Sequence, residues 1–509
     1  MFLSRILGFF RNTAIAALFG QNNITDAYNT AYLLPDTLYL ILIGGGVSSA
    51  FIPVLARYIR ENQEDEGWRV ISIAFSITLI GMSIVILLGF VFAPAVVKIL
   101  APWFSPAKLA LTVALTRVTI LAILFHSLNG VLIGTEYAYN SFWATSIGPL
   151  IYNATIVAAG VLLAPSMGIF SFAWATVIGA FLNFLVQLWG TFRLKPKFAF
   201  SLNIHHPGLK RVGSLMLPAT IGLSIAQLNL VFNQAFLASR LQGGAINALS
   251  ISSRVMLVPV LVATSIGITL LPSLAQRAAD DDLRAYKTYV RKALRAVVFV
   301  SLPSAVGIML LAHPIVRILF QHGRFSGTAS DVTAATLYFY SVGILAYGAY
   351  EILSRAFWAL GDTKTPLLAG LFSIGLGIGL NLLLISLLTY RGLALAYSLT
   401  GFLNAITLLY LLRRRVGALG WRDIAGAFAR TAGATAVMAV VLLATRSYLT
   451  EHLLRGAGLM GGLVQLLSPL VLGLLVFLLA AWLLKLPEVS LVVGVLRRRL
   501  PSRVRAEGA

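Results

Sequence analysis

The chain has 509 residues, of which 59% are apolar and 11% are charged, and its mean hydropathy is +0.89. This composition excludes an ordinary soluble globular protein and indicates an integral membrane protein. The net charge of +22 does not indicate a nucleic-acid-binding protein, because the basic residues lie in short connections between apolar segments. The chain has no cysteine, which excludes disulfides and thiolate metal sites.

Segments of about 20 apolar residues can cross a bilayer. Breaks at polar residues, prolines and glycines divide the chain into fourteen predicted spans. They cover residues 2–20, 24–56, 69–97, 109–134, 141–164, 168–192, 212–239, 245–275, 293–320, 330–360, 366–389, 392–412, 424–445 and 459–485. We interpret the first as a retained helix and not a signal peptide, since no small-residue cleavage site precedes Asp26. The predicted fold class is an all-α polytopic membrane protein.

The basic residues of the connections predict the orientation. With the N-terminus inside, the inner connections and the C-terminal tail hold 26 Lys and Arg residues, and the outer connections hold 8, including Lys108. Cytoplasmic loops are enriched in Lys and Arg, so both termini are predicted to be cytoplasmic. The remaining five basic residues lie inside predicted spans: Arg5, Arg11, Arg117, Arg254 and Arg430.

A weak internal repeat appears when the first half is moved forward by 219 residues, which places Pro53 on Pro272. It pairs spans 1 and 2 with spans 7 and 8, so two parallel six-helix lobes with a substrate site between them are expected. The predicted domains are the N-lobe, the C-lobe, spans 13 and 14, and a basic cytoplasmic tail. Their boundaries are 1–192, 193–412, 413–485 and 486–509.

Prolines and glycines interrupt the paired spans 2 and 8 at Pro35, at the glycines that start with Gly44, at Pro259 and at Gly267. Such breaks point to moving helices that line a cavity. Ordinary kinking in a packed bundle is an equal alternative, because Gly and Pro are common in membrane helices.

Charged residues inside a span are costly and normally face a cavity or a protein interior. Arg5 and Arg11 are about 9 Å apart along a helix and about 120° apart around it, so both can reach one anion. Arg254 could approach from the other lobe, and three guanidinium groups suit a phosphate or pyrophosphate. The alternative for Arg5 is to extend to the membrane surface. Arg117 and Arg430 are expected to do this or to pair locally.

Asp26 lies near the outer edge of span 2, where it could line the cavity or cap a helix. Asp36 lies deeper and could pair with a cavity arginine. Asn233 and Asn381 are expected to form hydrogen bonds between helices. No catalytic or nucleotide-binding motif is present, so the chain is predicted to be a transporter without cofactors. An ion gradient, the membrane potential or the substrate gradient would supply its energy.

Several segments together resemble the MurJ/MviN family, the bacterial lipid II flippases of the multidrug/oligosaccharidyl-lipid/polysaccharide exporter superfamily. They are SRILGFFRN, the TDAY at 25–28, SSAFIPVLARY, SSRVMLVPV followed by LLPSL, FQHGRFS, and SRAFWALGDTKTP. The resemblance implies fourteen helices, with spans 13 and 14 forming a groove for the polyprenyl tail. It also implies export by alternating access of a disaccharide pentapeptide linked to undecaprenyl pyrophosphate.

By position, Arg5, Arg11 and Arg254 match the family's cavity arginines, and Asp26 matches its span-2 aspartate. Asn12, Asp36, Tyr39 and Asn247 are further cavity-lining candidates. Asn12 and Tyr39 stand where the family usually has an acidic residue and often has another arginine, and Gly44 replaces a frequent glutamate. Asn233, considered with Asn381 for a cation site, replaces an aspartate linked to cation binding, which argues against sodium. Members usually begin about a dozen residues earlier, which is compatible with a shortened span 1.

The leading hypothesis is a lipid II flippase of the bacterial cytoplasmic membrane. It is expected to be a monomer whose partners are lipid II, membrane lipids and cell-wall synthesis proteins. A flippase for another lipid-linked oligosaccharide is the first alternative. A drug/cation antiporter would need a carboxylate-rich cavity, and a membrane glycosyltransferase would need loop carboxylates, so both are less favoured.

Overall fold

The computed structural model describes residues 2–41, 48–214, 216, 231–280, 282–449 and 459–489. Every regular element within these ranges is a helix. The helices form two compact units, which we describe separately. The first unit holds Met1–Ser250 and Phe320–Ala329, and the second holds Ile251–Leu319 and Ser330–Ala509.

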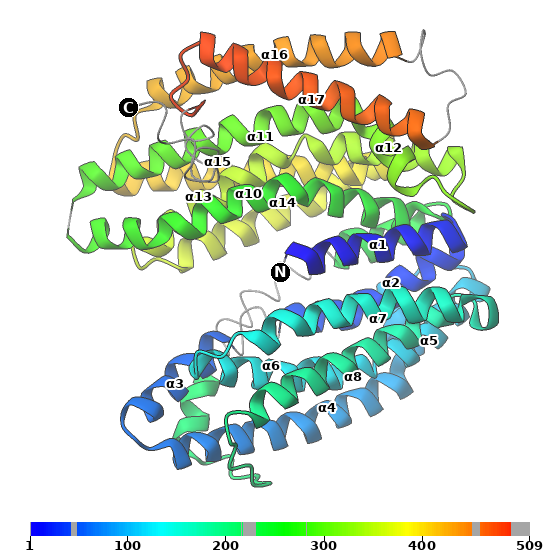
Figure 1. Cartoon of the computed structure of the whole chain (residues 1–509), viewed down its shortest axis with the longest axis vertical. Helices are drawn as coiled ribbons and strands as arrows, with labels where there is room; N and C mark the ends of the chain where they lie inside the picture. The colour runs from blue at the N-terminus through cyan, green and yellow to red at the C-terminus, as the bar shows by residue number, and fades with distance from the viewer. Residues whose placement is uncertain are drawn as a thin grey trace, which may run out of the picture. The chain divides into compact units, whose positions relative to one another are not determined.

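The first unit is built from α1 to α8, two short helical turns and the start of α10 (Figure 1). The bounds are α1 Phe2–Phe19, α2 Asn23–Ile41, α3 Ser48–Arg60, α4 Glu64–Leu100, α5 Pro106–Thr119, α6 Ala122–Ala138, α7 Trp143–Met167, α8 Phe170–Phe192, η2 Phe232–Leu237 and η3 Ala238–Arg240. α7 and α8 pack along each other, and α1 packs on α7. Buried Ile15, Tyr28 and Phe172 form part of the core that joins α1, α2 and α8.

The second unit contains most of α10, α11 and α12 and all of α13 to α17. The bounds are α10 Ala245–Ala279, α11 Leu283–Phe320, α12 Gly327–Ser341, α13 Ile344–Ala359, α14 Lys364–Leu388, α15 Tyr390–Val416, α16 Trp421–Tyr448 and α17 Leu459–Leu483. One core joins α10, α11, α13 and α15 around Tyr286, Phe357 and Leu408. A second core joins α16 and α17 to α11 through Met438, Phe477 and Phe299, and α16 and α17 lie side by side in Figure 1.

Ten helical segments among the described residues are long and apolar enough to cross a membrane, with α5 and α6 counted as one. The bent pair α12 and α13, which meet at 42°, makes eleven. These eleven coincide with predicted spans 3 to 6 and 8 to 14. Among the described residues, Leu7–Phe19 of α1 form a shorter apolar helix. Spans 2 and 7 include 42–47 and 217–230, which lie outside the described residues, as do Gly44 and the residues beside it. The total of fourteen stays a prediction.

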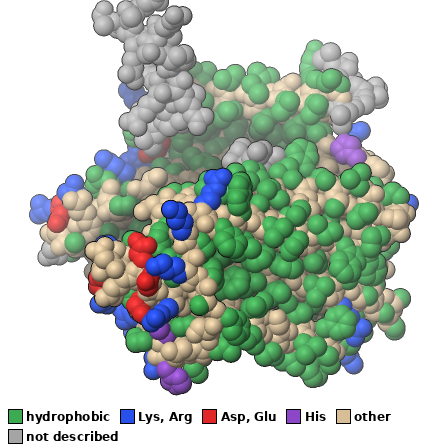
Figure 2. Space-filling model, turned by 60° about the horizontal axis from the view of Figure 1, so that its bottom comes forward, with side chains coloured by type: hydrophobic (Ala, Val, Ile, Leu, Met, Phe, Trp, Pro, Cys, Tyr) green, Lys and Arg blue, Asp and Glu red, His purple; other side chains and the backbone are tan. Residues whose placement is uncertain are grey.

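Many large apolar side chains lie on the outside of the helices, as a lipid environment requires. Leu87 in the middle of α4 is 64% exposed, for example. Figure 2 shows a broad hydrophobic face, with a group of charged side chains on the left of the view and others along the right edge. An exposed apolar surface of this extent marks a membrane-embedded face.

The connection between α11 and α12, residues 321–326, contacts the end of α1 in the first unit. The Arg324 backbone N–H donates to the Ala17 carbonyl at 2.8 Å. Gly323 adopts φ 58°, and a Cβ there would lie 2.3 Å from the same carbonyl oxygen. Only glycine combines this backbone angle with so close an approach. The FQHGRFS segment therefore positions the helix that carries Arg11.

Candidate functional site

Arg11 is a buried cation in the middle of α1, with 5% of its surface exposed. Its guanidinium carbon lies 4.7 Å from the centroid of the Tyr32 ring on α2. Its Nη1 atom donates to the Tyr32 hydroxyl at 2.9 Å, and that hydroxyl lies 3.0 Å from the Tyr152 hydroxyl on α7. Tyr32 therefore holds the guanidinium in place, and Tyr152 from a neighbouring helix bonds Tyr32.

The positive charge of Arg11 is not neutralised by an ion pair among the described residues. Its Nε atom is also buried and has no hydrogen-bond partner among the residues that the structure describes. Asp36, which is half-buried on α2, acts on Arg11 only through its electric field. A buried charge without a counterion is costly, so this position favours binding of an anion.

Asp26 lies in the first turn of α2 and is almost completely buried. Its Oδ2 atom accepts a hydrogen bond from Lys108 Nζ at 2.9 Å and another from the Gly244 backbone N–H at 2.7 Å. Its Oδ1 atom accepts from the Asn247 backbone N–H at 2.9 Å. The carboxylate therefore caps the N-terminus of α10, where N–H groups lack partners within the helix. The capping alternative thus describes this residue, although the helix it caps is α10 and not its own.

Asn247 joins the same cluster. Its Oδ1 atom accepts from Asn29 Nδ2 at 2.9 Å. The structure therefore brings together Asp26 and Asn247 of the predicted set. Arg11 contacts a different residue, Tyr32 of α2.

The other predicted cavity residues are less defined. Arg254 is half-buried on the α10 segment of the second unit, so its approach to the ligand of Arg11 stays a prediction. Asn12 on α1 is half-buried. The side chains of Arg5 and Tyr39 lie outside the described residues.

The two candidates for a cation site belong to different units. Asn233 is buried in η2 of the first unit. Asn381 is buried in α14 of the second unit, and its Nδ2 atom donates to the Gly377 carbonyl at 2.8 Å. This hydrogen bond of Asn381 lies within its own helix and not between helices as predicted, and a shared cation site stays a prediction. No group of three or more metal-ligating side chains occurs among the described residues.

Sequence reasoning missed Lys108, which was counted with the outer connections. It lies in the first turn of α5 and is buried against Asp26. A signal was present, because a lysine in the first turn of a helix opposes the helix dipole and therefore needs a compensating partner. Arg117, in contrast, interacts locally as expected, since its Nε donates to the Phe90 carbonyl at 3.2 Å.

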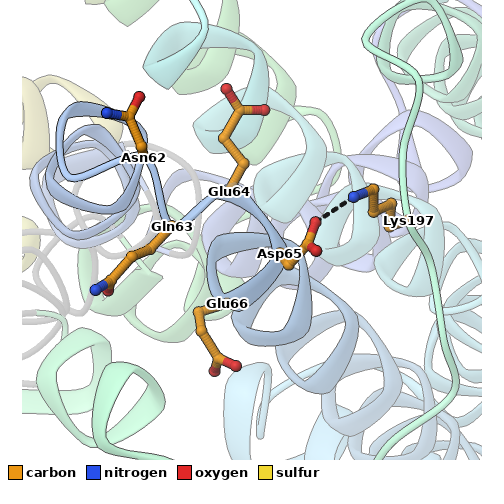
Figure 3. Close-up of a pocket in the computed structure, with 6 residues that line it drawn as sticks. All are labelled: Asn62, Gln63, Glu64, Asp65, Glu66 and Lys197. Carbon is orange, nitrogen blue, oxygen red and sulfur yellow. Dashed lines mark hydrogen bonds and ion pairs between the residues drawn. The ribbon is translucent and has the colours of Figure 1, made fainter.

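A polar pocket occurs elsewhere in the first unit, at the turn between α3 and α4 (Figure 3). Glu64, Asp65 and Glu66 line it, and Lys197 reaches Asp65 from the segment after α8 to form an ion pair. None of the residues predicted to bind substrate contributes to this pocket.

Comparisons with known proteins agree with the fold and with the motifs. The family model described as lipid II flippase MurJ matches residues 15–464. The lipid II flippase MurJ of Burkholderia cenocepacia is 31% identical over 427 residues, which cover 81% of this chain and 82% of that protein. A probable lipid II flippase MurJ of Rhizobium tropici is 29% identical over 520 residues, which cover 98% and 95%.

Solved structures extend the comparison. A lipid II flippase MurJ in an inward closed conformation has a TM-score of 0.79 at 26% identity, covering 94% of this chain and 96% of that one. An inward-facing multidrug transporter of the MATE family has a TM-score of 0.69 at 13% identity, covering 82% and 95%. The second likeness concerns the fold alone. Because the family model matches most of its length, the chain belongs to the lipid II flippase MurJ family.

Proposed function

We propose that this protein moves lipid II from the inner to the outer leaflet of the bacterial cytoplasmic membrane. The match of the MurJ family model over residues 15–464 carries the proposal. The relatives that match over most of this chain are named lipid II flippases or probable lipid II flippases. As a transporter, the protein positions and moves its substrate without changing a covalent bond.

Arg11 is the residue we assign to the pyrophosphate of lipid II. The guanidinium group presents planar N–H donors that match phosphate oxygens, and it keeps its charge in an apolar setting. Burial without an ion pair among the described residues leaves its charge to be compensated by a ligand. Arg5 and Arg254 would add further donors to the same headgroup. Asp26 would act indirectly, by holding α10 against α2 and α5.

The architecture proposed for transport has fourteen spans in two six-helix lobes, 1–192 and 193–412. α16 and α17 correspond to spans 13 and 14 and would hold the polyprenyl tail in the lipid-facing groove. Both termini would lie in the cytoplasm, as the excess of basic residues in the inner connections supports. The protein would work as a monomer alongside the cell-wall synthesis proteins that use lipid II.

The membrane potential could drive export, because the headgroup is anionic and the cell interior is negative. Moving one negative charge outward releases about 2.3 kcal/mol of free energy per 100 mV of membrane potential. The alternative energy source is the gradient of a monovalent cation that binds near Asn233 or Asn381. Measuring flipping in proteoliposomes with an imposed potential and no ion gradient distinguishes the two.

The test of function is growth of cells depleted of their own lipid II flippase. We expect the wild-type chain to support growth and Arg11→Ala to fail at an equal protein level in the membrane. Arg117→Ala is the matched control, since Arg117 binds a carbonyl of its own unit and should be dispensable. Growth supported by Arg11→Ala would show that the pyrophosphate assignment is wrong.

Substrate identity needs a separate measurement with purified protein in vesicles. Lipid II should be flipped faster than other lipid-linked oligosaccharides, and faster export of one of those would replace lipid II as the substrate. The antiporter alternative has little support, since the likeness to the MATE transporter is at the level of the fold.

A further inference from the structure

The segment that follows α8 runs along the outside of α4 in the first unit. We call residues 197–206 the strap. The backbone N–H of Ala199 donates to Ser72 Oγ at 3.2 Å, and that of Ser201 donates to Ser76 Oγ at 3.4 Å. Because Ser72 and Ser76 are one turn apart, the strap advances along the helix in the direction of its apolar middle.

Both ends of the strap return to the first turn of α4. Lys197 pairs with Asp65, as Figure 3 shows, and His206 Nε2 lies 3.1 Å from Glu66 Oε2. Asp65 and Ser76 are eleven positions apart, which corresponds to about 16 Å along the helix. The strap therefore runs along α4 for about this distance from its first turn and then returns to that turn.

The tip of the strap exposes three large apolar side chains: Phe200 is 71% exposed, Leu202 49% and Ile204 59%. A tight turn at Asn203 holds them, since its Oδ1 atom accepts from the His205 N–H at 3.2 Å. Three exposed apolar groups on a chain pinned by hydrogen bonds form a surface that water does not favour.

The residues that flank the tip carry positive charge. They are Arg193, Lys195, Lys197, Lys210 and Arg211. The Arg193 guanidinium carbon lies 4.9 and 4.4 Å from the ring centroids of Trp143 and Trp189, an aromatic setting typical of the membrane interface. The carboxylates of α4 nearest the strap, Asp65 and Glu66, face Lys197 and His206. The other flanking cations are thus available to anionic headgroups.

The length of α4 places the tip at the edge of the bilayer. α4 has 37 residues, or about 55 Å, whereas the hydrocarbon core is about 30 Å thick. Counting about 20 residues back from Lys98, at the far end, places the boundary of the core near residue 78. Ser76 lies at that boundary. The large exposed apolar residues of α4 begin just beyond it, at Ile80.

We propose that the strap is an interfacial membrane anchor. Phe200, Leu202 and Ile204 insert among the lipids of the leaflet at this end of the first unit, and the flanking Lys and Arg residues bind anionic phospholipid headgroups. Lipid is the occupant, and not another protein, because the tip continues the lipid-facing surface of α4 and its flanks carry the charge that anionic leaflets attract. The anchor would hold the connection between α8 and the following span at the cytoplasmic surface in the proposed orientation.

The absence of cysteine makes the test direct, since one introduced cysteine can carry a nitroxide spin label without background. The full chain carrying Phe200→Cys is labelled in vesicles containing phosphatidylglycerol, and the accessibility of the label to oxygen and to a water-soluble nickel complex is measured. Leu87→Cys on α4 is the lipid control, and Gln63→Cys at the α3–α4 turn is the water control. The label at residue 200 should have an accessibility like that of the label at residue 87, with the ratio of oxygen to nickel accessibility several-fold higher than at residue 63. Accessibility like that at 63 overturns the proposal.

The charge requirement is tested with Lys195→Gln, Lys210→Gln and Arg211→Gln combined in the labelled chain. This triple variant, or removal of phosphatidylglycerol, should make the label more accessible to the nickel complex. The control is a second triple variant at exposed cations of the second unit, which should leave the accessibility unchanged. It combines Arg413→Gln, Arg414→Gln and Arg422→Gln. Equal shifts for both triple variants contradict headgroup binding by the flanks. Spin–spin broadening that rises with protein density would mean that a second copy covers the tip, and would also overturn the proposal.

Discussion

Asp26 of α2 and Lys108 of α5 form a buried ion pair, with Nζ 2.9 Å from Oδ2 and side-chain exposures of 1% and 6%. The same carboxylate binds two backbone N–H groups at the start of α10, at Gly244 and Asn247. One carboxylate therefore joins three helices that are distant in the sequence. Because an uncompensated buried charge costs several kcal/mol, Asp26 and Lys108 depend on each other.

Replacing Lys108 with methionine should lower the free energy of unfolding by about 3–5 kcal/mol, because it leaves the Asp26 charge without its cation. The double variant with Asp26→Asn should recover much of the loss, since neither charge is then buried. Thermal unfolding of the purified proteins in one detergent measures both. Arg57→Met is the control, since the exposed pair with Glu61 should be worth at most about 1 kcal/mol. Equal stability of Lys108→Met and this control would contradict the prediction.

Tyr32→Phe should slow lipid II flipping about tenfold without lowering the protein level. It removes the hydrogen bond to Arg11 but keeps the aromatic ring beneath the guanidinium, and a hydrogen bond to a charged group contributes about 1.5–3 kcal/mol. Tyr152→Phe should have a smaller effect, because Tyr152 contacts Tyr32 and not Arg11. Initial flipping rates in proteoliposomes give the comparison. If Tyr32→Phe is as fast as the wild type, the hydroxyl does not position Arg11.

Gly323→Ala should destabilise the first unit by about 1–3 kcal/mol, because φ at this position is positive and the new Cβ would collide with the Ala17 carbonyl. The end of α1 should loosen first, and Arg11 with it. Gly370→Ala is the control, since Gly370 lies within α14 with open space around its Cβ position, and alanine there should be neutral or slightly stabilising. Thermal unfolding compares the two. A Gly323→Ala protein as stable as the control would show that the loop does not hold α1 in this way.

Asp362, in the connection between α13 and α14, should make stability depend on pH at the acid end. Burial raises the pKa of its carboxyl, but hydrogen bonds from Thr365 and the charge of Arg415 outweigh this effect and hold the pKa below its usual value. The unfolded chain, with a pKa of about 3.9, therefore takes up this proton first as the pH falls. The stabilisation is complete above the unfolded pKa and is lost as the pH falls through the folded one.

Asp362→Asn should therefore unfold at a lower temperature than the wild type at pH 7. The difference should begin to shrink near pH 4, where the unfolded wild-type chain takes up its proton, and should be lost as the pH falls through the lower pKa of the folded state. Unfolding temperatures from pH 7 to pH 3 test this. A difference that stays constant over that range would mean that the charge of Asp362 does not contribute.

Hydropathy predicted most of the membrane-embedded helices correctly, because a helix in lipid must satisfy its own backbone hydrogen bonds and be apolar over its whole length. This constraint is local in sequence. It allowed α4, α7, α8 and most of the later helices to be recognised within about five residues, although α11 begins ten residues before its predicted span. It did not reveal that Lys108, counted with an exposed connection, is buried, because burial depends on what packs against a residue.

The sequence by itself determined that this chain is a membrane protein of many helices and that Arg11 lies where a charge is costly, since both follow from composition within a short segment. Only the tertiary structure decided which residues bind the charged groups. Tyr32 of α2 binds Arg11 and is itself bonded to Tyr152 of α7, and Lys108 reaches Asp26 across 82 residues of chain. Such partners are chosen by the packing of distant helices, and no local pattern of residues encodes that packing.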